Sequence, residues 1–212
     1  MNIRKWSVSP LNKENAAQIA DRYDIPHFLA MMLDIRGFTS DEDIQNVLYN
    51  TASLSDPFLI KDMDKAVDRI RKAIDEFEKI AVYGDYDTDG VTSTSILYSY
   101  LDTVGADVIF YIPERESGYG LNIEAVDFLK KQDVSLIITV DNGIASIEEI
   151  SYANSLGMDV VVTDHHQPHD KLPDAVAIVD PHRKDCPSDF KDLCGAGVVL
   201  KLIIALENGD ED

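Results

Sequence analysis

Short apolar runs alternate with segments of helical periodicity along the second half of the chain. The runs read as buried strands, and they cover residues 79–84, 107–113, 135–140, 158–163 and 175–180. Apolar residues recur at helical spacing in the segments 91–105, 122–132, 144–157 and 197–209. Strands that alternate with helices of this length predict an α/β fold, with a parallel, doubly wound sheet of about five strands flanked by helices. Strands that are apolar at nearly every position fit a sheet covered on both faces.

The first part of the chain has a different pattern, which is helical and irregular. Residues 16–25 and 40–50 each space their apolar residues as a helix does, and Ser40 with Asp43 marks a helix start. Residues 64–79 predict an amphipathic helix whose buried stripe is formed by Val67, Ile70, Ile74 and Phe77. We therefore expect a helical N-terminal segment over residues 1–60 and an α/β domain over residues 61–212.

Composition narrows the class of protein. Hydrophobic residues make up 45% and charged residues 27% of the chain, as in ordinary globular domains. The formal net charge of −20 argues against broad electrostatic capture of nucleic acid by this segment. It does not exclude a nucleic-acid substrate held through metal ions or by a basic domain elsewhere. We expect a cytoplasmic protein without a membrane segment, because no apolar run approaches the ~18 residues of a span, and Cys186 and Cys194 have no zinc-site spacing.

Three of the predicted strands are followed at once by carboxylates or imidazoles. These residues are Asp85, Asp87 and Asp89 after the first strand, Asp141 after the third, and Asp164, His165 and His166 after the fourth. Because the carboxyl ends of parallel strands meet at one edge of a sheet, we expect these side chains to converge. Carboxylates with imidazole and no thiolate suit Mn²⁺ or Mg²⁺, and also Zn²⁺. The set exceeds what one ion needs, so it predicts two ions that activate a water for attack on phosphorus.

Each of these motifs has a plainer interpretation when taken alone. The pattern of residues 85–90 also opens calcium-binding EF-hand loops, but such a loop needs a Glu where Ile96 stands and follows a helix rather than a strand. It could equally be a solvated turn. Residues 140–143 could form a common turn, and residues 164–166 could be a helix cap followed by surface histidines. Their joint position after three strands favours the metal site.

The motifs together resemble the DHH phosphoesterase superfamily, and within it the RecJ-type single-strand-specific 5′→3′ exonucleases of DNA repair and recombination. The resemblance rests on GDYDTDG (84–90), TVDNGI (139–144), TDHHQP (163–168), IPERESGYGLN (112–122), SDPFLIKDMDKAVDRI (55–70), IVDPHR (178–183) and LCGAGVVLKL (193–202). It spans nearly the whole chain. It implies hydrolysis of phosphodiester bonds with two Mn²⁺ or Mg²⁺ ions.

The resemblance also implies a role for each residue of the metal site. Asp87 would bind one metal and Asp89 the other, and Asp141 would bridge them. His165 would be a further ligand, Asp85 would complete the shell of the first metal, Asp164 would support the loop, and His166 would face the scissile phosphate. Tyr83 occupies a position where pyrophosphatase and small phosphodiesterase relatives often carry histidine, which fits the exonuclease branch.

Four further residues are candidates for contact with the substrate. Arg115 could clamp a phosphate, since a guanidinium matches phosphate with two hydrogen bonds, or it could pair with Glu114 or Glu116 on the surface. His182 could orient a phosphate or cap its own loop. Gly195 and Gly197 could let the backbone approach a DNA strand, or could serve plain turns.

The family pattern places a fourth metal-binding aspartate and a nucleic-acid-binding domain beyond Asp212. We therefore expect an isolated catalytic domain, incomplete at its C-terminus, with weak or no activity alone and a weakened second metal site. Its expected partners are single-stranded DNA, held mainly by other domains, and replication or repair proteins. Two alternatives stay open: a phosphodiesterase or phosphatase acting on short oligonucleotides, cyclic dinucleotides or pyrophosphate, and a non-catalytic scaffold module. The N-terminal helices and the GYGL segment favour the exonuclease.

Overall fold

The computed structural model describes residues 9–49, 54–115 and 120–207. The chain divides into two compact units, Met1–Leu54 and Ser55–Asp212, which are described separately. No helix among the described residues has both the length and the apolarity that crossing a bilayer requires.

The first unit contains three helices, α1 (Lys13–Tyr23), α2 (His27–Ile35) and α3 (Asp41–Tyr49). The Ser40 hydroxyl accepts a hydrogen bond from the Asp43 amide at 3.1 Å, which confirms the predicted helix start. Helix α2 was not predicted as a separate element, because its sequence is apolar on most sides and lacks a polar cap. The small core of this unit consists of Ile19, Ala30, Leu33 and Ile44.

The second unit is built on a five-stranded sheet in which every neighbouring pair is parallel. The strands are β1 (Ile80–Tyr83), β2 (Val108–Tyr111), β3 (Leu136–Val140), β4 (Asp159–Thr163) and β5 (Ala177–Val179), in the spatial order β2-β1-β3-β4-β5. The helices are α4 (Met63–Asp75), α5 (Thr88–Thr103), α6 (Ile123–Lys131), α7 (Ile147–Ser155) and α8 (Gly195–Glu207), and a short 3₁₀ turn, η1 (Pro57–Leu59), precedes them. The predicted α/β class and strand number are confirmed.

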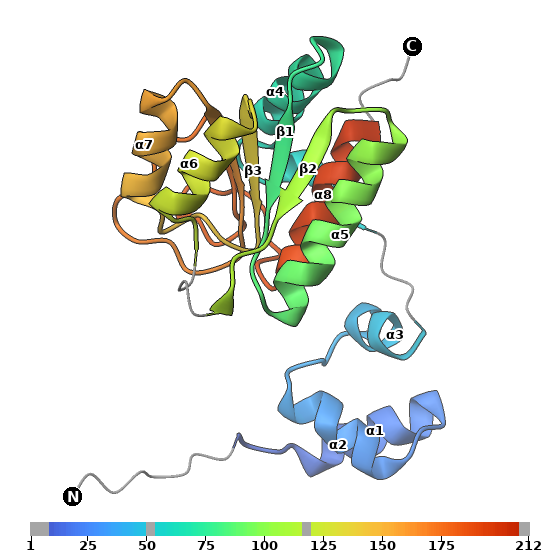
Figure 1. The fold of residues 1–212 in the computed structure, drawn as a ribbon. Coiled ribbons are helices and arrows are strands. Elements are labelled where there is room, and N and C mark those ends of the chain that lie inside the picture. Colours follow the sequence, from blue (N-terminus) through green and yellow to red (C-terminus); the bar gives the residue numbers. More distant parts are fainter. Residues whose placement is uncertain (1–8, 50–53, 116–119, 208–212) are drawn as a thin grey trace, which may run out of the picture. The chain divides into compact units, whose positions relative to one another are not determined.

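Helices cover both faces of this sheet. Helices α6 and α7 lie on one face, whereas α4, α5 and α8 lie on the other (Figure 1). The alternation along each strand explains the two layers: Ile80 and Val82 of β1 join the core under α4, α5 and α8, whereas Ala81 and Tyr83 join the core under α6 and α7. Both cores are apolar, which is why the strands read as continuous hydrophobic runs.

Helix α4 is shorter than its hydrophobic pattern predicts. It ends at Asp75, and Phe77, which was expected on the buried stripe, is 82% exposed. Phe77 has a left-handed backbone with φ 55°, and the Glu78 amide donates to the Ala73 carbonyl at 2.8 Å across it. This hydrogen bond closes the helix as a Schellman motif, a role that glycine usually has. The helical periodicity therefore continued in the sequence past the end of the helix.

Candidate metal centre

The acidic residues lie where the winding of the sheet changes direction. From β1 the chain crosses outward to β2 and then returns past β1 to β3, so β1 and β3 are neighbours whose connections leave in opposite directions. Such a switch point leaves a crevice at the carboxyl ends of the two strands. Asp85, Asp87 and Asp89 follow β1 and Asp141 follows β3, which places them at this crevice.

The start of helix α5 fixes the positions of the aspartates that follow β1. This helix begins at Thr88, three residues before the predicted start, because Asp87 acts as its N-cap: the Asp87 Oδ1 atom accepts from the Gly90 amide at 2.9 Å. Asp89 lies in the first helical turn. A Cβ atom on Gly90 would lie 2.6 Å from the Asp85 carbonyl oxygen, so only glycine fits at this position.

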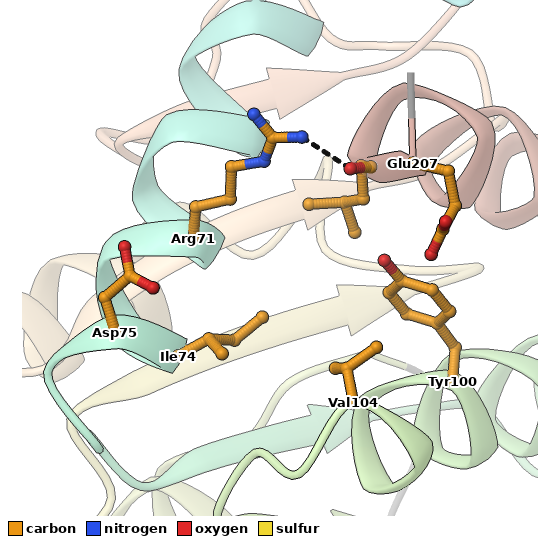
Figure 2. A pocket seen from close by; sticks show the side chains of 7 residues that line it. Arg71, Ile74, Asp75, Tyr100, Val104 and Glu207 are labelled. Carbon is orange, nitrogen blue, oxygen red and sulfur yellow. Dashed lines mark hydrogen bonds between the residues drawn. The ribbon is translucent and has the colours of Figure 1, made fainter. Parts of the chain in front are cut away.

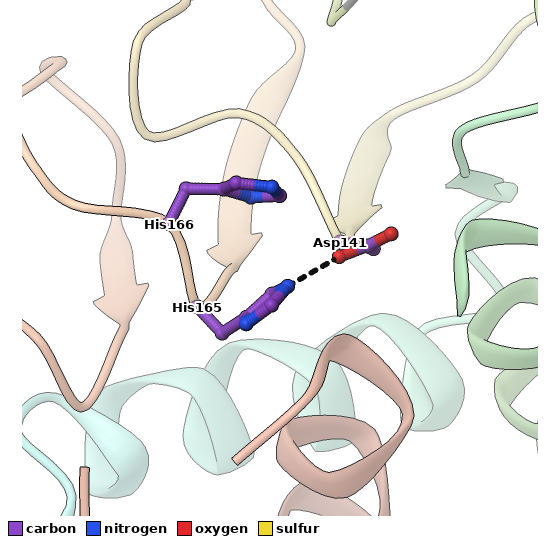
Figure 3. A group of neighbouring side chains, drawn as sticks. All are labelled: Asp141, His165 and His166. Carbon is purple, nitrogen blue, oxygen red and sulfur yellow. Dashed lines mark ion pairs between the residues drawn. The ribbon is translucent and has the colours of Figure 1, made fainter. Parts of the chain in front are cut away.

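Asp141 occupies the centre of the group. It follows β3 directly, is 2% exposed, and has a left-handed backbone with φ 61°. Its Oδ1 atom lies 3.0 Å from Nε2 of His165, which reaches it from the loop after β4 (Figure 3). The same His165 nitrogen lies 3.6 Å from Asp89 Oδ2. Segments that follow three different strands thus meet at Asp141.

Asp164 contacts the backbone of both histidines that follow it. It is buried, and its Oδ1 atom accepts from the amides of His165 at 2.7 Å and His166 at 3.1 Å. The Oδ2 atom accepts from the Ile144 amide at 2.9 Å. These hydrogen bonds join the loop after β4 to the loop after β3.

The side chains form two groups with the geometry of a metal site. In each group, one ligand atom per residue lies within 4.8 Å of the others; the groups are Asp85, Asp87 and Asp141, and Asp141, His165 and His166. Asp141 is a member of both. Asp89 is a member of neither, and its carboxylate is held by the Gly195 and Ala196 amides at the start of α8.

The electrostatics of this group suit a divalent cation. Burial, followed by the negative charges of Asp89 and Asp87, raises the pKa of Asp141 to about 7. Burial also raises the pKa of Asp85, with the nearby charge of Asp87 acting in the same direction. The buried Oδ1 atom of Asp85 has no hydrogen-bond donor among the described residues. Crowded carboxylates, two of them buried, fit Mn²⁺ or Mg²⁺, and the imidazole of His165 is compatible with either ion.

The predicted substrate-contacting residues lie around the same edge. The guanidinium carbon of Arg115 lies 4.9 Å from the ring centroid of Tyr86, a cation–π contact within the acidic turn. The amide of His182 donates to Asp180 at 2.7 Å. Gly195 begins α8 beside Asp141, whereas a Cβ atom on Gly197 would meet only the side chains of Leu193 and Cys194. Glu116, one of the two surface partners expected for Arg115, lies outside the residues that the structure describes.

Tyr83 is the last residue of β1 and lies just before the acidic turn. It is fully buried at the end of β1, and its hydroxyl donates to the Gly120 carbonyl at 2.9 Å. Its ring stacks on Tyr111 of the neighbouring strand with 5.3 Å between centroids. Burial raises the pKa of its hydroxyl, so Tyr83 stays neutral.

Asp180 is a member of this edge that sequence reasoning missed as a candidate. It follows β5, is completely buried, and accepts from the His182 amide. Burial raises the pKa of its carboxyl to about 7 against the lowering effect of that amide, and the charge of Asp164 raises it further. The signal was present, because the predicted strand 175–180 has this aspartate as its last residue, whereas the other three strands are followed at once by theirs.

Two cavities differ in their relation to this site. One of about 270 Å³ adjoins His166 and is lined by residues that include Gly120, Ser146, Glu149, Gln167 and His169. Another of about 270 Å³ lies between the C-terminal ends of α4, α5 and α8 (Figure 2). There the Arg71 guanidinium donates to the Leu206 carbonyl at 2.5 Å, close to the end of α8. Because α5 and α8 begin at the acidic residues, this second cavity lies at the far end of the helices from the candidate metal centre.

Comparison with known proteins gives the family. The family model described as "DHH family, N-terminal domain" matches residues 79–212, which include every strand of the sheet and both metal-site groups. The chain belongs to the DHH family. The resemblance inferred from the sequence motifs is thereby confirmed.

Several similar proteins are named RecJ exonucleases. The chain is 44% identical over 204 residues to the single-stranded-DNA-specific exonuclease RecJ of Bacillus subtilis. The matched residues make up 95% of this DHH chain but 26% of that protein. A solved structure of RecJ from Thermus thermophilus in complex with Mn²⁺ has a TM-score of 0.73 and 29% identity, over 95% of this chain and 28% of that one. A second solved structure, an exonuclease RecJ bound to manganese, has a TM-score of 0.66 and 35% identity, over 74% and 40% of the two chains. This chain thus spans about a quarter to two fifths of these relatives.

Proposed function

We propose that the chain forms the catalytic DHH portion of a metal-dependent single-stranded-DNA exonuclease of the RecJ type, acting 5′→3′ in DNA repair and recombination. The observation that carries the proposal is that Asp141 belongs to both groups of potential metal ligands. A carboxylate shared by two ligand groups is suited to bridge two ions, and a phosphodiester substrate suits such a pair. Relatives with this sequence pattern are named as exonucleases of single-stranded DNA.

In the proposed site, the ligands come from both groups and from Asp89, which belongs to neither group but lies near His165. Asp85 and Asp87 would hold one Mn²⁺ or Mg²⁺ ion, Asp89 and His165 would hold the other, and Asp141 would contact both. When bound, the two ions would activate a water as nucleophile and stabilise charge on the entering and leaving oxygens. Asp164 would not bind metal, because three backbone amides and the His166 ring occupy the roughly four lone-pair sites of its carboxylate.

The remaining residues would orient the DNA. His166, whose Nδ1 contacts Asp164, directs its Nε2 atom away from that carboxylate and could donate a proton toward the scissile phosphate. Arg115 over Tyr86 supplies a cation beside the acidic turn, and His182 and Gly197 lie along the same edge of the sheet. Since the chain carries a net charge of −20, most of the attraction for DNA would come from the ions and from other parts of the protein. Replication or repair partners and a cytoplasmic location belong to the same proposal.

The test is a nuclease assay on 5′-labelled single-stranded DNA with Mn²⁺, using both the 212-residue chain and a longer protein that contains it. We expect Asp141→Ala to reduce the cleavage rate by at least about a hundredfold, since it removes a ligand of both ions. Asp133→Ala is the matched control, because Asp133 has the same left-handed backbone (φ 61°) but is exposed at the opposite end of β3. Equal cleavage by Asp141→Ala and Asp133→Ala would refute the site.

The cavity beside His166 supports a second candidate, a phosphodiesterase that acts on short oligonucleotides. Its volume of about 270 Å³ is suited to a single nucleotide unit next to the proposed metal centre. Turnover of dinucleotides compared with long single strands separates the two functions. Preference for dinucleotides in the longer protein would favour the phosphodiesterase.

A further inference from the structure

The first turn of α8 contacts one carboxylate of the candidate metal centre through its backbone. The Gly195 amide donates to Asp89 Oδ2 at 2.7 Å, and the Ala196 amide donates to Asp89 Oδ1 at 2.9 Å. Each carboxylate oxygen thus has one backbone donor, and the donors come from residues more than 100 positions away along the chain. Two donors on two oxygens fix both the position and the plane of the Asp89 carboxylate.

This contact leaves the carboxylate able to bind a cation. An ionised carboxylate has about four lone-pair sites on its two oxygens, and the amides occupy two of them. The remaining sites are free to face His165, whose Nε2 atom is 3.6 Å from Asp89 Oδ2. The first amides of a helix have no partner within the helix and carry partial positive charge. This charge favours the ionised form of Asp89 among its acidic neighbours.

The same turn also makes close contact with Asp141. A Cβ atom built on Gly195 would lie 2.6 Å from both Cβ and Oδ1 of Asp141, far inside van der Waals distance. Gly195 is not among the residues with positive φ, so glycine is needed here for space and not for backbone conformation. Asp141 cannot easily move away, because it is buried and its backbone is fixed at the end of β3. The absence of a side chain at Gly195 therefore sets how closely α8 approaches the central carboxylate.

We propose that Gly195 and Ala196 are positioning residues, which hold Asp89 and Asp141 at the spacing that a second divalent cation requires. Gly195 would accordingly serve the metal ligands rather than contact the DNA strand. The helices α5 and α8 pack side by side (Figure 1), and Asp89, in the first turn of α5, ties their N-terminal ends together. This inference rests on the proposed metal centre and adds to it a specific support for the ion held by Asp89 and His165.

Titration of the metal-free chain with Mn²⁺ by calorimetry tests the role of α8. Gly195→Ala introduces the clash with Asp141, and Ala196→Pro removes one donor to Asp89 at a helix position that tolerates proline. We expect both variants to weaken Mn²⁺ binding at the Asp89 site by about tenfold or more, the usual effect of losing support behind a ligand. In Ala196→Pro, binding at the Asp85 and Asp87 site should stay within about threefold, since the lost donor serves Asp89 alone. Gly195→Ala should weaken both sites, because it displaces Asp141, which belongs to both ligand sets.

A matched control isolates this effect. Ala196→Ser keeps the amide donor to Asp89, so this variant should bind Mn²⁺ as the unchanged chain does. Unaltered affinity in folded Gly195→Ala and Ala196→Pro would overturn the inference. Absence of Mn²⁺ binding by the unchanged chain, or binding that survives Asp141→Asn, would instead overturn the proposed metal centre.

A measurement on the unchanged chain covers the case in which the variants do not fold. Binding of diamagnetic Mg²⁺ to Asp89 would withdraw charge from the acceptor of two amide protons. We therefore expect the Gly195 and Ala196 amide resonances to shift during a Mg²⁺ titration, and those of Gly105, whose surroundings are open, to stay in place. Unshifted Gly195 and Ala196 resonances at saturating Mg²⁺ would also overturn the inference.

Discussion

The Asp164 carboxylate lies 2.7 Å from the ring Nδ1 atom of His166. Because an ionised carboxylate can only accept a hydrogen bond, this contact places a proton on Nδ1 and leaves Nε2 directed away from Asp164. Asp164 also accepts from the backbone of both histidines. One buried side chain thus sets the path of the loop and the orientation of the ring that it presents.

Replacing Asp164 should change the titration of His166. The hydrogen bond that the His166 ring donates to Asp164 raises the pKa of His166 above its usual 6.5, more than burial lowers it. In Asp164→Asn the negative charge is gone, so the pKa of His166 should fall to its usual value or below. The measurement is a pH titration of the histidine ring resonances in the metal-free chain. Asp170→Asn is the control, since Asp170 pairs with Lys184 on the surface, and equal His166 titrations in the two variants would contradict this assignment.

Divalent cations should stabilise the folded chain. A ligand that binds only the folded state adds about 2.7 kcal/mol at a hundred times its dissociation constant. We expect Mn²⁺ to raise the melting temperature by several degrees, and EDTA to reverse the change. In Asp141→Asn the rise should be largely lost, because both ligand groups lose a member. A full Mn²⁺ effect in this variant would show that the ion stabilises the chain elsewhere.

Asp180 should make stability depend on pH. Its folded pKa of about 7 lies above the ordinary value of 3.8, because burial disfavours the charged form. The stability that this carboxyl contributes is therefore complete below about pH 4 and is lost as the pH rises through 7. Asp180→Asn keeps an oxygen for the His182 amide and carries no charge. We expect this variant to gain stability relative to the unchanged chain between pH 5 and pH 8, by about 1 kcal/mol or more.

The check for Asp180 is urea denaturation of both proteins at pH 5 and at pH 8, without metal. The difference in unfolding free energy between them should grow toward pH 8. A difference that is the same at both pH values would mean that Asp180 does not titrate in this range.

Two glycine-to-alanine substitutions should differ sharply in their cost. At Gly90 the new Cβ atom would lie 2.6 Å to 2.7 Å from backbone and side-chain atoms of Asp85, so the turn after β1 would have to open. At Gly105 nothing lies within 4 Å, and only the left-handed backbone, φ 82°, opposes the change. We expect Gly105→Ala to cost about 1 kcal/mol and Gly90→Ala about 3 kcal/mol or more. Thermal unfolding of both variants measures this, and similar melting temperatures would contradict the close approach at Gly90.

The sheet and the gathering of acidic residues were predictable because parallel topology determines them. Apolar runs such as 135–140 matched strands such as β3 (Leu136–Val140), since burial on both faces leaves few polar positions. Once the strands were parallel, residues as distant as Asp87, Asp141 and His165 had to meet at one edge. Which of them bind metal or DNA stays a prediction.

Other features depend on contacts that no local pattern encodes. The exposure of Phe77 follows from a left-handed helix end, although its spacing continued the apolar stripe. The early start of α5 follows from the Asp87 cap on Gly90. The hold of α8 on Asp89 joins residues 106 positions apart, so it was visible only in three dimensions.

The left-handed backbone of Asp141 lowers the stability of the folded chain at the residue that the proposed metal centre needs most. An aspartate in this conformation is strained by about 1 kcal/mol, and its buried carboxylate adds a further penalty near neutral pH when no cation is present. Glycine would remove both burdens together with the ligand. Selection for heat tolerance alone should therefore replace this aspartate early. The resulting variants would unfold at higher temperature but would lack the central metal ligand.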